Sequence, residues 1–157
     1  MIFLKEKLKT YIISILIPLI VGGLSAMFTF SNMNIYNEIN KPFLSTPGVV
    51  FPIVWTILYI LMGISSAMIK LSDSENKADA LIIYRFSLLI NFFWSIIFFN
   101  MRAYNFAFVW LIALWLFVLY TIIKYSKINK TAAILQIPYL LWLTFAGYLN
   151  LMISILN

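Results

Sequence analysis

Residues 131–157 read TAAILQIPYLLWLTFAGYLNLMISILN and contain no charged side chain. Four further stretches between charged residues are also uncharged: 28 residues between Lys9 and Glu38, 28 between Lys41 and Lys70, 16 between Arg85 and Arg102, and 21 between Arg102 and Lys124. A helix needs about 20 apolar residues to cross a bilayer. We therefore predict an all-α integral membrane protein, a single domain with five transmembrane helices near 11–30, 49–70, 82–100, 104–123 and 132–154.

The composition agrees with this prediction. Of the 157 residues, 64% are hydrophobic and 10% are charged, which is too apolar for a soluble domain, a disordered chain or a coiled coil. The third stretch is the shortest, and Arg85 and Arg102 at its ends can extend toward the lipid headgroups. None of the stretches alternates strictly as a barrel strand does, so helices are expected.

Basic residues are distributed unevenly over the loops. With five spans, the first ten residues and the regions around 71–81 and 124–131 share one side and account for nine of the eleven Lys and Arg residues. Only Lys41 and Arg102 lie on the other side. The positive-inside rule then predicts a cytoplasmic N-terminus and an outer C-terminus in a multi-pass protein of a bacterial cell membrane. The dispersed net charge of +6 does not suggest nucleic-acid binding.

The first apolar stretch also has features of a signal peptide, since a basic start precedes it and small residues occur at 22–26. It is long for a signal peptide, and the five-span charge pattern requires it, so we expect it to remain. Its small residues Ser14, Pro18, Gly22 and Ala26 recur every four positions. This spacing suits close approach of another helix, within the bundle or in a dimer.

The loop from 31 to 48 is the only predicted outer segment large enough to fold over the bundle. It contains four asparagines, the aromatic residue Tyr36, and the helix breakers Pro42 and Pro47. A short helix around 33–40 is predicted. We call residues 31–48 the covering loop.

Polar residues inside the spans are candidates for a site, because they are costly in a membrane. Ser87, Asn91 and Ser95 share one face of the third span, and Gln136 lies in the fifth. They either join neighbouring helices or line a pocket. No Asp or Glu lies inside a span, which argues against an ion-coupled transporter and against acid–base catalysis. Cys and His are absent, so we predict no metal site and no conventional catalytic residue.

Two aromatic stripes suggest a lining for a large, flat, apolar ligand. One occupies the second span and the other the fifth; their members are Phe51, Trp55, Tyr59, Met62, Leu135, Tyr139, Trp142, Ala146 and Leu149. Packing against lipid at the membrane interface is the alternative. Trp55 and Trp142 lie deeper in their spans than interfacial residues usually do.

Three blocks of this sequence resemble the TspO/MBR family of tryptophan-rich sensory proteins, which are related to the mitochondrial translocator protein once called the peripheral benzodiazepine receptor. They are KPFLSTPGVVFPIVWTILY at 41–59, NFFWSIIFF at 91–99 and IPYLLWLTFAGYLN at 137–150. The blocks occur in the family's order and in the predicted spans. The resemblance covers nearly the whole chain.

The resemblance implies a five-helix bundle, commonly a homodimer in membrane lipid, that acts as a receptor or sensor. Its ligands would be tetrapyrroles such as protoporphyrin IX, or flat synthetic molecules, held under the covering loop without another cofactor. The residues implied in the pocket are Trp55, Trp142, Tyr36, Asn91, Ser95 and Ala146. Other members are described as regulators of stress or pigment synthesis, or as promoting light-dependent porphyrin breakdown, in which Trp55 and Trp142 would take part. Porphyrin or lipid transport and a structural role in a larger complex remain alternatives.

This chain also departs from the family pattern. Leu44 stands where tryptophan is usual, and Thr46 replaces the first residue of a Pro-Pro pair. No basic residue follows Tyr148, so the cholesterol motif of animal members is not expected. We hypothesise that Lys41 and Arg102 contact the propionates of a bound porphyrin. The alternative is that both contact lipid phosphates.

Overall fold

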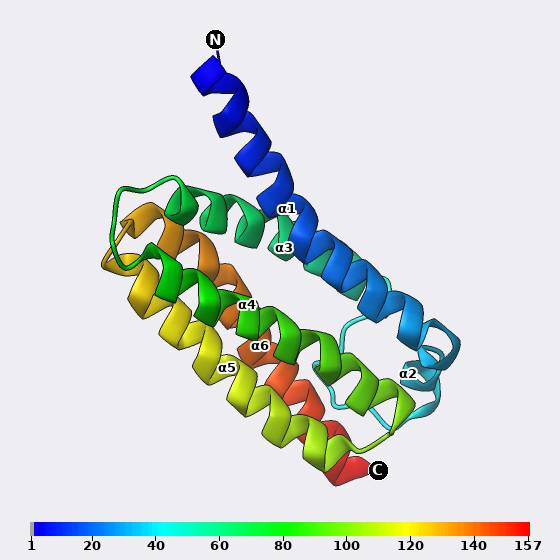
Figure 1. Ribbon diagram of the computed structural model, residues 1–157. Coiled ribbons are helices and arrows are strands. Elements are labelled where there is room, and N and C mark those ends of the chain that lie inside the picture. Colours follow the sequence, from blue (N-terminus) through cyan, green and yellow to red (C-terminus); the bar gives the residue numbers. More distant parts are fainter. Residues whose placement is uncertain (1) are drawn as a thin grey trace.

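The fold is a bundle of long helices, seen in a computed structural model that describes residues 2–157 (Figure 1). The elements in chain order are α1 (Ile2–Thr29), η1 (Phe30–Asn32), α2 (Ile35–Glu38), α3 (Val50–Lys70), α4 (Lys77–Ser95), η2 (Ile96–Asn100), α5 (Tyr104–Ser126) and α6 (Lys130–Leu156). Within the described residues, five helices are long and apolar enough to cross a membrane. The predicted all-α five-helix architecture is confirmed, whereas the orientation of the termini stays a prediction.

Helix ends differ most from the predicted spans at the starts of α1 and α4, and α4 begins at Lys77 rather than at 82. α1 begins at Ile2, well before residue 11, because Lys5, Lys7 and Lys9 end the apolar stretch without breaking a helix. The third span reaches Asn100 as predicted, but its last five residues form the π-helical turn η2. At the start of α6, the side chain of Asn129 accepts a hydrogen bond from the Ala132 backbone N–H at 3.0 Å, which caps the helix.

α1 and α3 pack closely where glycine allows it. A Cβ atom on Gly63 would overlap the backbone of Ile15 and would lie 2.8 Å from the carbonyl oxygen of Ser14. Seven residues further along α1, a Cβ atom on Gly22 would overlap the ring of Tyr59. Small residues at a helix crossing let two backbones approach within a membrane. Two members of the predicted small-residue stripe, Ser14 and Gly22, therefore lie at this contact.

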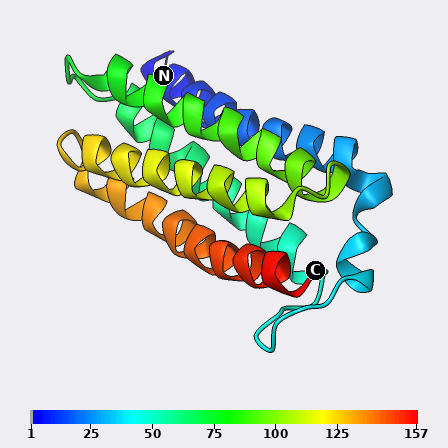
Figure 2. The same ribbon diagram turned by 90° about the horizontal axis from the view of Figure 1, so that it is seen from below.

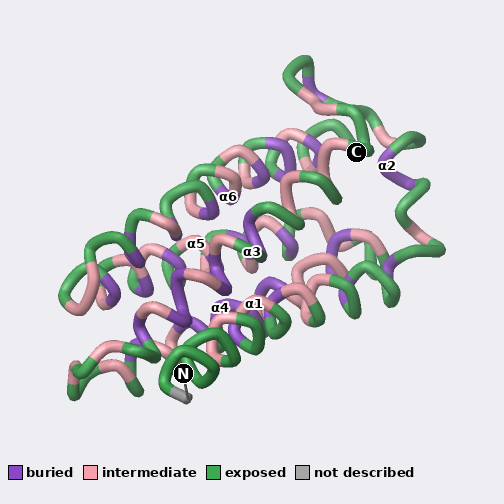
Figure 3. Tube along the Cα trace, turned by 90° about the horizontal axis from the view of Figure 1, so that it is seen from above, coloured by how far each residue is buried: buried purple, intermediate pink, exposed green. Residues whose placement is uncertain are grey.

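Exposed positions lie on the outer faces of the helices, and buried positions lie on the faces turned toward neighbouring helices (Figure 3). Many of the exposed residues are large and apolar. Polar side chains inside the bundle form hydrogen bonds between helices. The Ser65 hydroxyl donates to the carbonyl of Ala132 at 2.7 Å, and the Gln136 side-chain amide donates to Ser65 at 3.2 Å. Gln136 thus joins α6 to α3, as the helix-joining interpretation of the polar residues predicts.

The covering loop lies at one end of the bundle, beside the end of α6 (Figure 2). Asn40 and Asn157 connect the two segments: the Asn40 backbone N–H donates to the Asn157 side-chain oxygen at 3.0 Å, and the Asn157 amide donates to the Asn40 carbonyl at 3.0 Å. The short helix predicted at 33–40 is present as α2, a single turn. This turn holds Tyr36 against the end of the bundle.

Candidate ligand-binding site

A cavity of about 630 Å³ lies among α1, α3, α6 and the α4–η2 segment, beneath the covering loop. Its volume falls in the range of small-molecule sites in proteins. The lining is mainly aromatic and small apolar, with a few polar groups. It consists of Leu19, Gly22, Gly23, Ser25, Ala26, Thr29, Met33, Asn34, Tyr36, Asn37, Gly48, Val49, Phe51, Pro52, Trp55, Thr56, Tyr59, Trp94, Ser95, Phe98, Phe99, Ala146, Leu149, Asn150 and Ile153.

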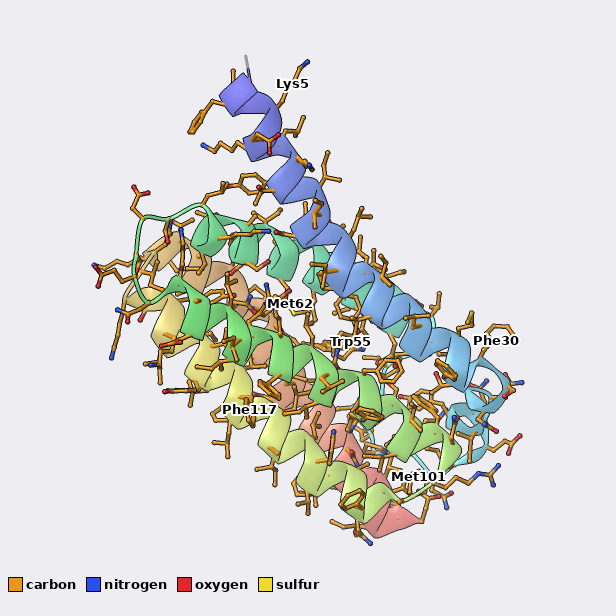
Figure 4. All side chains as sticks on the ribbon, in the orientation of Figure 1. Lys5, Phe30, Trp55, Met62, Met101 and Phe117 are labelled. Atoms are coloured by element: carbon orange, nitrogen blue, oxygen red, sulfur yellow. The ribbon has the colours of Figure 1, made fainter. Side chains whose placement is uncertain are left out.

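The α3 wall is built around Trp55, which Figure 4 shows in the space between α1 and α4. The Trp55 ring stacks on Tyr59, with ring centroids 5.4 Å apart and planes 27° from parallel. From behind, Tyr139 of α6 meets Trp55 edge to face at 5.9 Å. The Tyr59 hydroxyl in turn accepts a hydrogen bond from the side-chain amide of Asn91 at 3.0 Å. These contacts fix the orientation of the Trp55 ring.

The cover of the cavity is Tyr36. Its ring packs edge to face on Phe51 at 5.2 Å, and its hydroxyl donates to the backbone carbonyl of Thr46 at 3.0 Å. Burial raises the pKa of Tyr36, and the side chain of Thr46 lowers it by less, so the hydroxyl stays protonated at neutral pH. The Lys41 ammonium lies 4.8 Å from the centre of the Tyr36 ring.

The wall opposite α3 contains Trp94, Ser95, Phe98 and Phe99. Here the helix widens into η2, where the Met101 backbone N–H donates to the carbonyl five residues before it at 3.1 Å. Single π-helical turns occur frequently at functional sites. The centres of the Trp94 and Phe98 rings lie 5.4 Å apart with their planes tilted by 31°, which gives this wall a broad aromatic surface.

Asn150 of α6 holds Trp94 in place. Its side-chain oxygen accepts the indole N–H of Trp94 at 3.2 Å, and its amide nitrogen donates to the carbonyl of Tyr104 at 2.8 Å. Only 1% of Asn150 is exposed, and both of its hydrogen bonds are partly buried. Asn150 therefore connects the walls of the cavity to α5.

The structure brings six of the nine predicted site residues to the cavity: Tyr36, Phe51, Trp55, Tyr59, Ser95 and Ala146. Asn91 and Tyr139 support the wall from behind. Trp142 does not line the cavity: its ring packs on Phe51 at 5.8 Å and borders a separate apolar groove between α3 and α6.

The two predicted anion contacts lie in different places. Lys41 reaches the covering residue Tyr36, whereas Arg102 is exposed in the turn between η2 and α5 and lies outside the cavity lining. The φ angle of Arg102 is 51°, an unusual value for a residue other than glycine. Among the described residues, no group of three acidic, His or Cys side chains could hold a metal ion.

Sequence reasoning missed several lining residues. Trp94 lies three positions after Asn91, and Asn150 lies four after Ala146, so helical spacing could have added both. Of the two departures in the covering loop, Leu44 is 61% exposed and Thr46 serves through its backbone carbonyl. The bond from Tyr36 to Thr46 therefore needs no particular side chain at position 46.

The fold and the site together define a polytopic helical membrane protein with an aromatic cavity inside the bundle. The model of the TspO/MBR family matches residues 14–156, and the chain belongs to this family. Its relatives come from bacteria, archaea and animals.

The chain is similar to three relatives over most of their length. It is 32% identical to the tryptophan-rich protein TspO of Chlorobaculum tepidum, over 98% of this chain and 99% of that one. It is 36% identical to a tryptophan-rich sensory protein of Cereibacter sphaeroides, over 73% and 72% of the two chains. With the translocator protein of Bos taurus the identity is 31%, over 86% and 82%. The names of these relatives indicate a family of membrane sensors and transporters.

Proposed function

We propose that this protein is a membrane receptor or sensor that binds a tetrapyrrole, of which protoporphyrin IX is the example, inside the bundle. The observation that carries the proposal is the cavity itself, with a tryptophan on each of two facing walls. Trp55 on α3 and Trp94 on α4 offer flat apolar surfaces, and stacking is the favoured contact between such rings and a flat conjugated ligand.

Polar groups near the cover suit the acidic edge of a porphyrin. Asn34 and Asn37 line the cavity beside Tyr36, and the ammonium of Lys41 lies over the outer part of this cover. Propionates need hydrogen-bond donors or a cation when they leave water. The ring system would then lie between Trp55 and Trp94, with its propionates directed toward the covering loop.

The test is a dark titration of the purified protein with protoporphyrin IX, followed through the absorption of the porphyrin. We expect saturable binding at one porphyrin per chain. Trp55→Leu removes a stacking contact that contributes about 0.5–1.5 kcal/mol beyond the burial of apolar area. The dissociation constant of protoporphyrin IX should therefore rise by about 3- to 10-fold or more. Trp142→Leu should cost less, because Trp142 meets the cavity only through Phe51.

Trp115 provides the matched control. It lies on α5, its indole N–H donates to Thr144 at 2.9 Å, and it is not part of the cavity lining. Trp115→Leu is the same chemical change and should leave the porphyrin affinity unchanged. Equal weakening by Trp55→Leu and Trp115→Leu, or linear binding without saturation, would show that porphyrin merely dissolves in the detergent or the lipid.

A second candidate function, light-dependent breakdown of the bound porphyrin, is favoured by the stack of Trp55 on Tyr59. A tryptophan on the cavity wall is the side chain best placed to exchange an electron with an excited ligand. Illumination of the saturated complex separates the two functions. Loss of porphyrin absorption that depends on both light and Trp55 would support this activity. A stable spectrum under light would mean that the protein binds porphyrin without breaking it down.

A further inference from the structure

Three of the four gaps between the helices around the cavity are closed by direct contacts. Between α1 and α4, the Ser25 hydroxyl donates to the Phe92 carbonyl at 3.3 Å, and the Phe28 and Phe92 rings meet edge to face. The gap between α4 and α6 is closed by Trp94 and Asn150.

The third closed gap lies between α3 and α6. There, Phe51 packs on Trp142, with ring centroids 5.8 Å apart, and Trp55 packs on Tyr139 at 5.9 Å. The covering loop lies over the end of the cavity, held by Tyr36 and by the bonds between Asn40 and Asn157. Some lining residues at this end are exposed as well: Met33, Asn34, Asn37, Gly48 and Val49. A ligand therefore meets aromatic rings or hydrogen-bonded pairs between each of these three pairs of helices, and it meets the exposed residues of the covering loop at the end of the cavity.

The gap between α1 and α3 differs from the other three. Toward one end the two helices touch, at Ile15 against Gly63 and at Gly22 against Tyr59. Ala26 follows Ile15 by eleven residues, which is three helical turns, so it points from α1 toward α3 in the same direction. Ala26 is nevertheless exposed, and it belongs to the cavity lining.

The facing side of α3 shows the same pattern. Thr56 precedes Gly63 by seven residues, two helical turns, and so points toward α1. Thr56 and Pro52 are both exposed and both line the cavity. On α1, Gly23 is exposed as well, and a Cβ atom placed on it would meet nothing within 4 Å. The helices thus separate beyond Gly22 and leave a gap bordered by small side chains.

We propose that this gap is the entrance for the ligand and that it opens sideways into the hydrocarbon of the membrane. We define the lateral opening by Gly23 and Ala26 on α1 and by Pro52 and Thr56 on α3. The proposal rests on the proposed function, and it adds the route and the phase from which the ligand comes. Molecules that enter here are flat, partition into the bilayer and have an apolar ring system; the propionates of a porphyrin remain directed toward the covering loop.

The chemistry of the opening fits this class of molecule. The residues around it are apolar or carry a satisfied hydroxyl, since Thr56 donates to the carbonyl of Pro52 at 2.7 Å. Among the residues that the structure describes, no charged side chain belongs to the cavity lining, so an apolar ring system need not displace water from a charged group on this route. A ligand that partitions into lipid is also concentrated at this point before it binds.

The experiment labels a single cysteine in the lateral opening, which is possible because the chain contains no cysteine of its own. Gly23→Cys has room for its side chain. The variant is first saturated with protoporphyrin IX in the dark. It is then labelled with a bulky thiosulfonate, or with the methyl reagent as the small control, and porphyrin release into excess empty liposomes is followed.

We expect the bulky label to trap the bound porphyrin and to slow its release at least about tenfold. The methyl label should change the rate less than twofold, and cleavage of the bulky label with a reductant should restore it. Leu24→Cys is the matched position, since Leu24 is the next residue of α1, is 42% exposed and is not part of the cavity lining. The same bulky label there should leave the release rate unchanged.

Two results would overturn the proposal. Unchanged release from the bulky-labelled Gly23→Cys protein would mean that the ligand leaves by another route, and faster release would mean that the label expels it from the cavity. Both results leave the binding function intact. Absence of saturable binding in the unlabelled protein would instead refute the proposed function and the entrance together.

Discussion

Asn150 is the residue whose replacement should disturb both the bundle and the cavity most specifically. Its side chain accepts the Trp94 indole N–H at 3.2 Å and donates to the Tyr104 carbonyl at 2.8 Å. Only this orientation of the amide satisfies both partners, because an indole N–H can only donate and a carbonyl can only accept. Asn150→Leu keeps a similar volume and removes both bonds.

The magnitude follows from the two bonds. Hydrogen bonds between helices in a membrane protein contribute about 0.6 kcal/mol on average and up to about 1.7 kcal/mol. Two bonds therefore predict that Asn150→Leu lowers the free energy of unfolding by about 1–3 kcal/mol. The loss should show as a lower midpoint when the protein is unfolded with sodium dodecyl sulfate in mixed micelles.

A double-mutant cycle with Trp94→Phe isolates one of the bonds, because phenylalanine keeps a ring but has no N–H. We expect a coupling free energy of about 0.6–1.7 kcal/mol between positions 94 and 150. The porphyrin dissociation constant should also rise in Asn150→Leu, since Trp94 loses its anchor. A coupling of zero, or an unfolding free energy equal to that of the unmodified protein, would refute the role assigned to Asn150.

Three further perturbations test the packing, the cover and the charge at the cavity. Gly63→Leu should lower the free energy of unfolding by about 1–3 kcal/mol, because the new side chain overlaps α1. The control Gly23→Leu should lower it less, because its side chain has open space. Equal free energies of unfolding for the two variants would contradict the helix crossing. Lys41→Gln should raise the dissociation constant of protoporphyrin IX about 3- to 10-fold and leave that of an uncharged porphyrin unchanged. Arg102→Gln should leave both dissociation constants unchanged, because Arg102 lies outside the cavity lining. Tyr36→Phe should weaken porphyrin binding, because the bond to the Thr46 carbonyl is lost. In affinities measured against pH, the advantage of the unmodified protein over Tyr36→Phe should persist past pH 10 and be lost only as the pH rises through the raised pKa of Tyr36; its loss below pH 10 would argue against a buried, neutral Tyr36.

The sequence predicts the fold well because one physical requirement dominates it. Each helix that crosses a membrane must be apolar over about 20 residues, and charged residues collect at the ends. The gaps between charges therefore locate α3, α5 and α6 closely. The gaps between charges do not predict the N-terminal part of α1. The lysines there end the apolar stretch, but they do not end the helix. The π-helical form of η2 also leaves no signal in hydropathy.

The candidate site was predicted in part, for reasons that depend on helix geometry. Trp55, Tyr59 and Phe51 share the stripe of α3 that faces the interior, so periodicity finds them. Trp142 belongs to a stripe on α6 as well, but the direction of that stripe depends on how α6 packs against α3. Its ring lies behind Phe51, and spacing along one helix carries no such information. On α1 the spacing of small residues predicts only a packing stripe, although several residues of this helix line the cavity.

Filling the cavity tests the central claim most directly. Ala146 of α6 lines the cavity and is 6% exposed, so Ala146→Phe places a ring where the ligand would lie. Leu151→Phe adds a ring on the same helix at a position outside the cavity lining and serves as the control. A dark titration with protoporphyrin IX should show saturable binding to the unmodified and Leu151→Phe proteins and none to a folded Ala146→Phe protein. Undiminished saturable binding to Ala146→Phe would contradict the claim that this cavity holds the ligand.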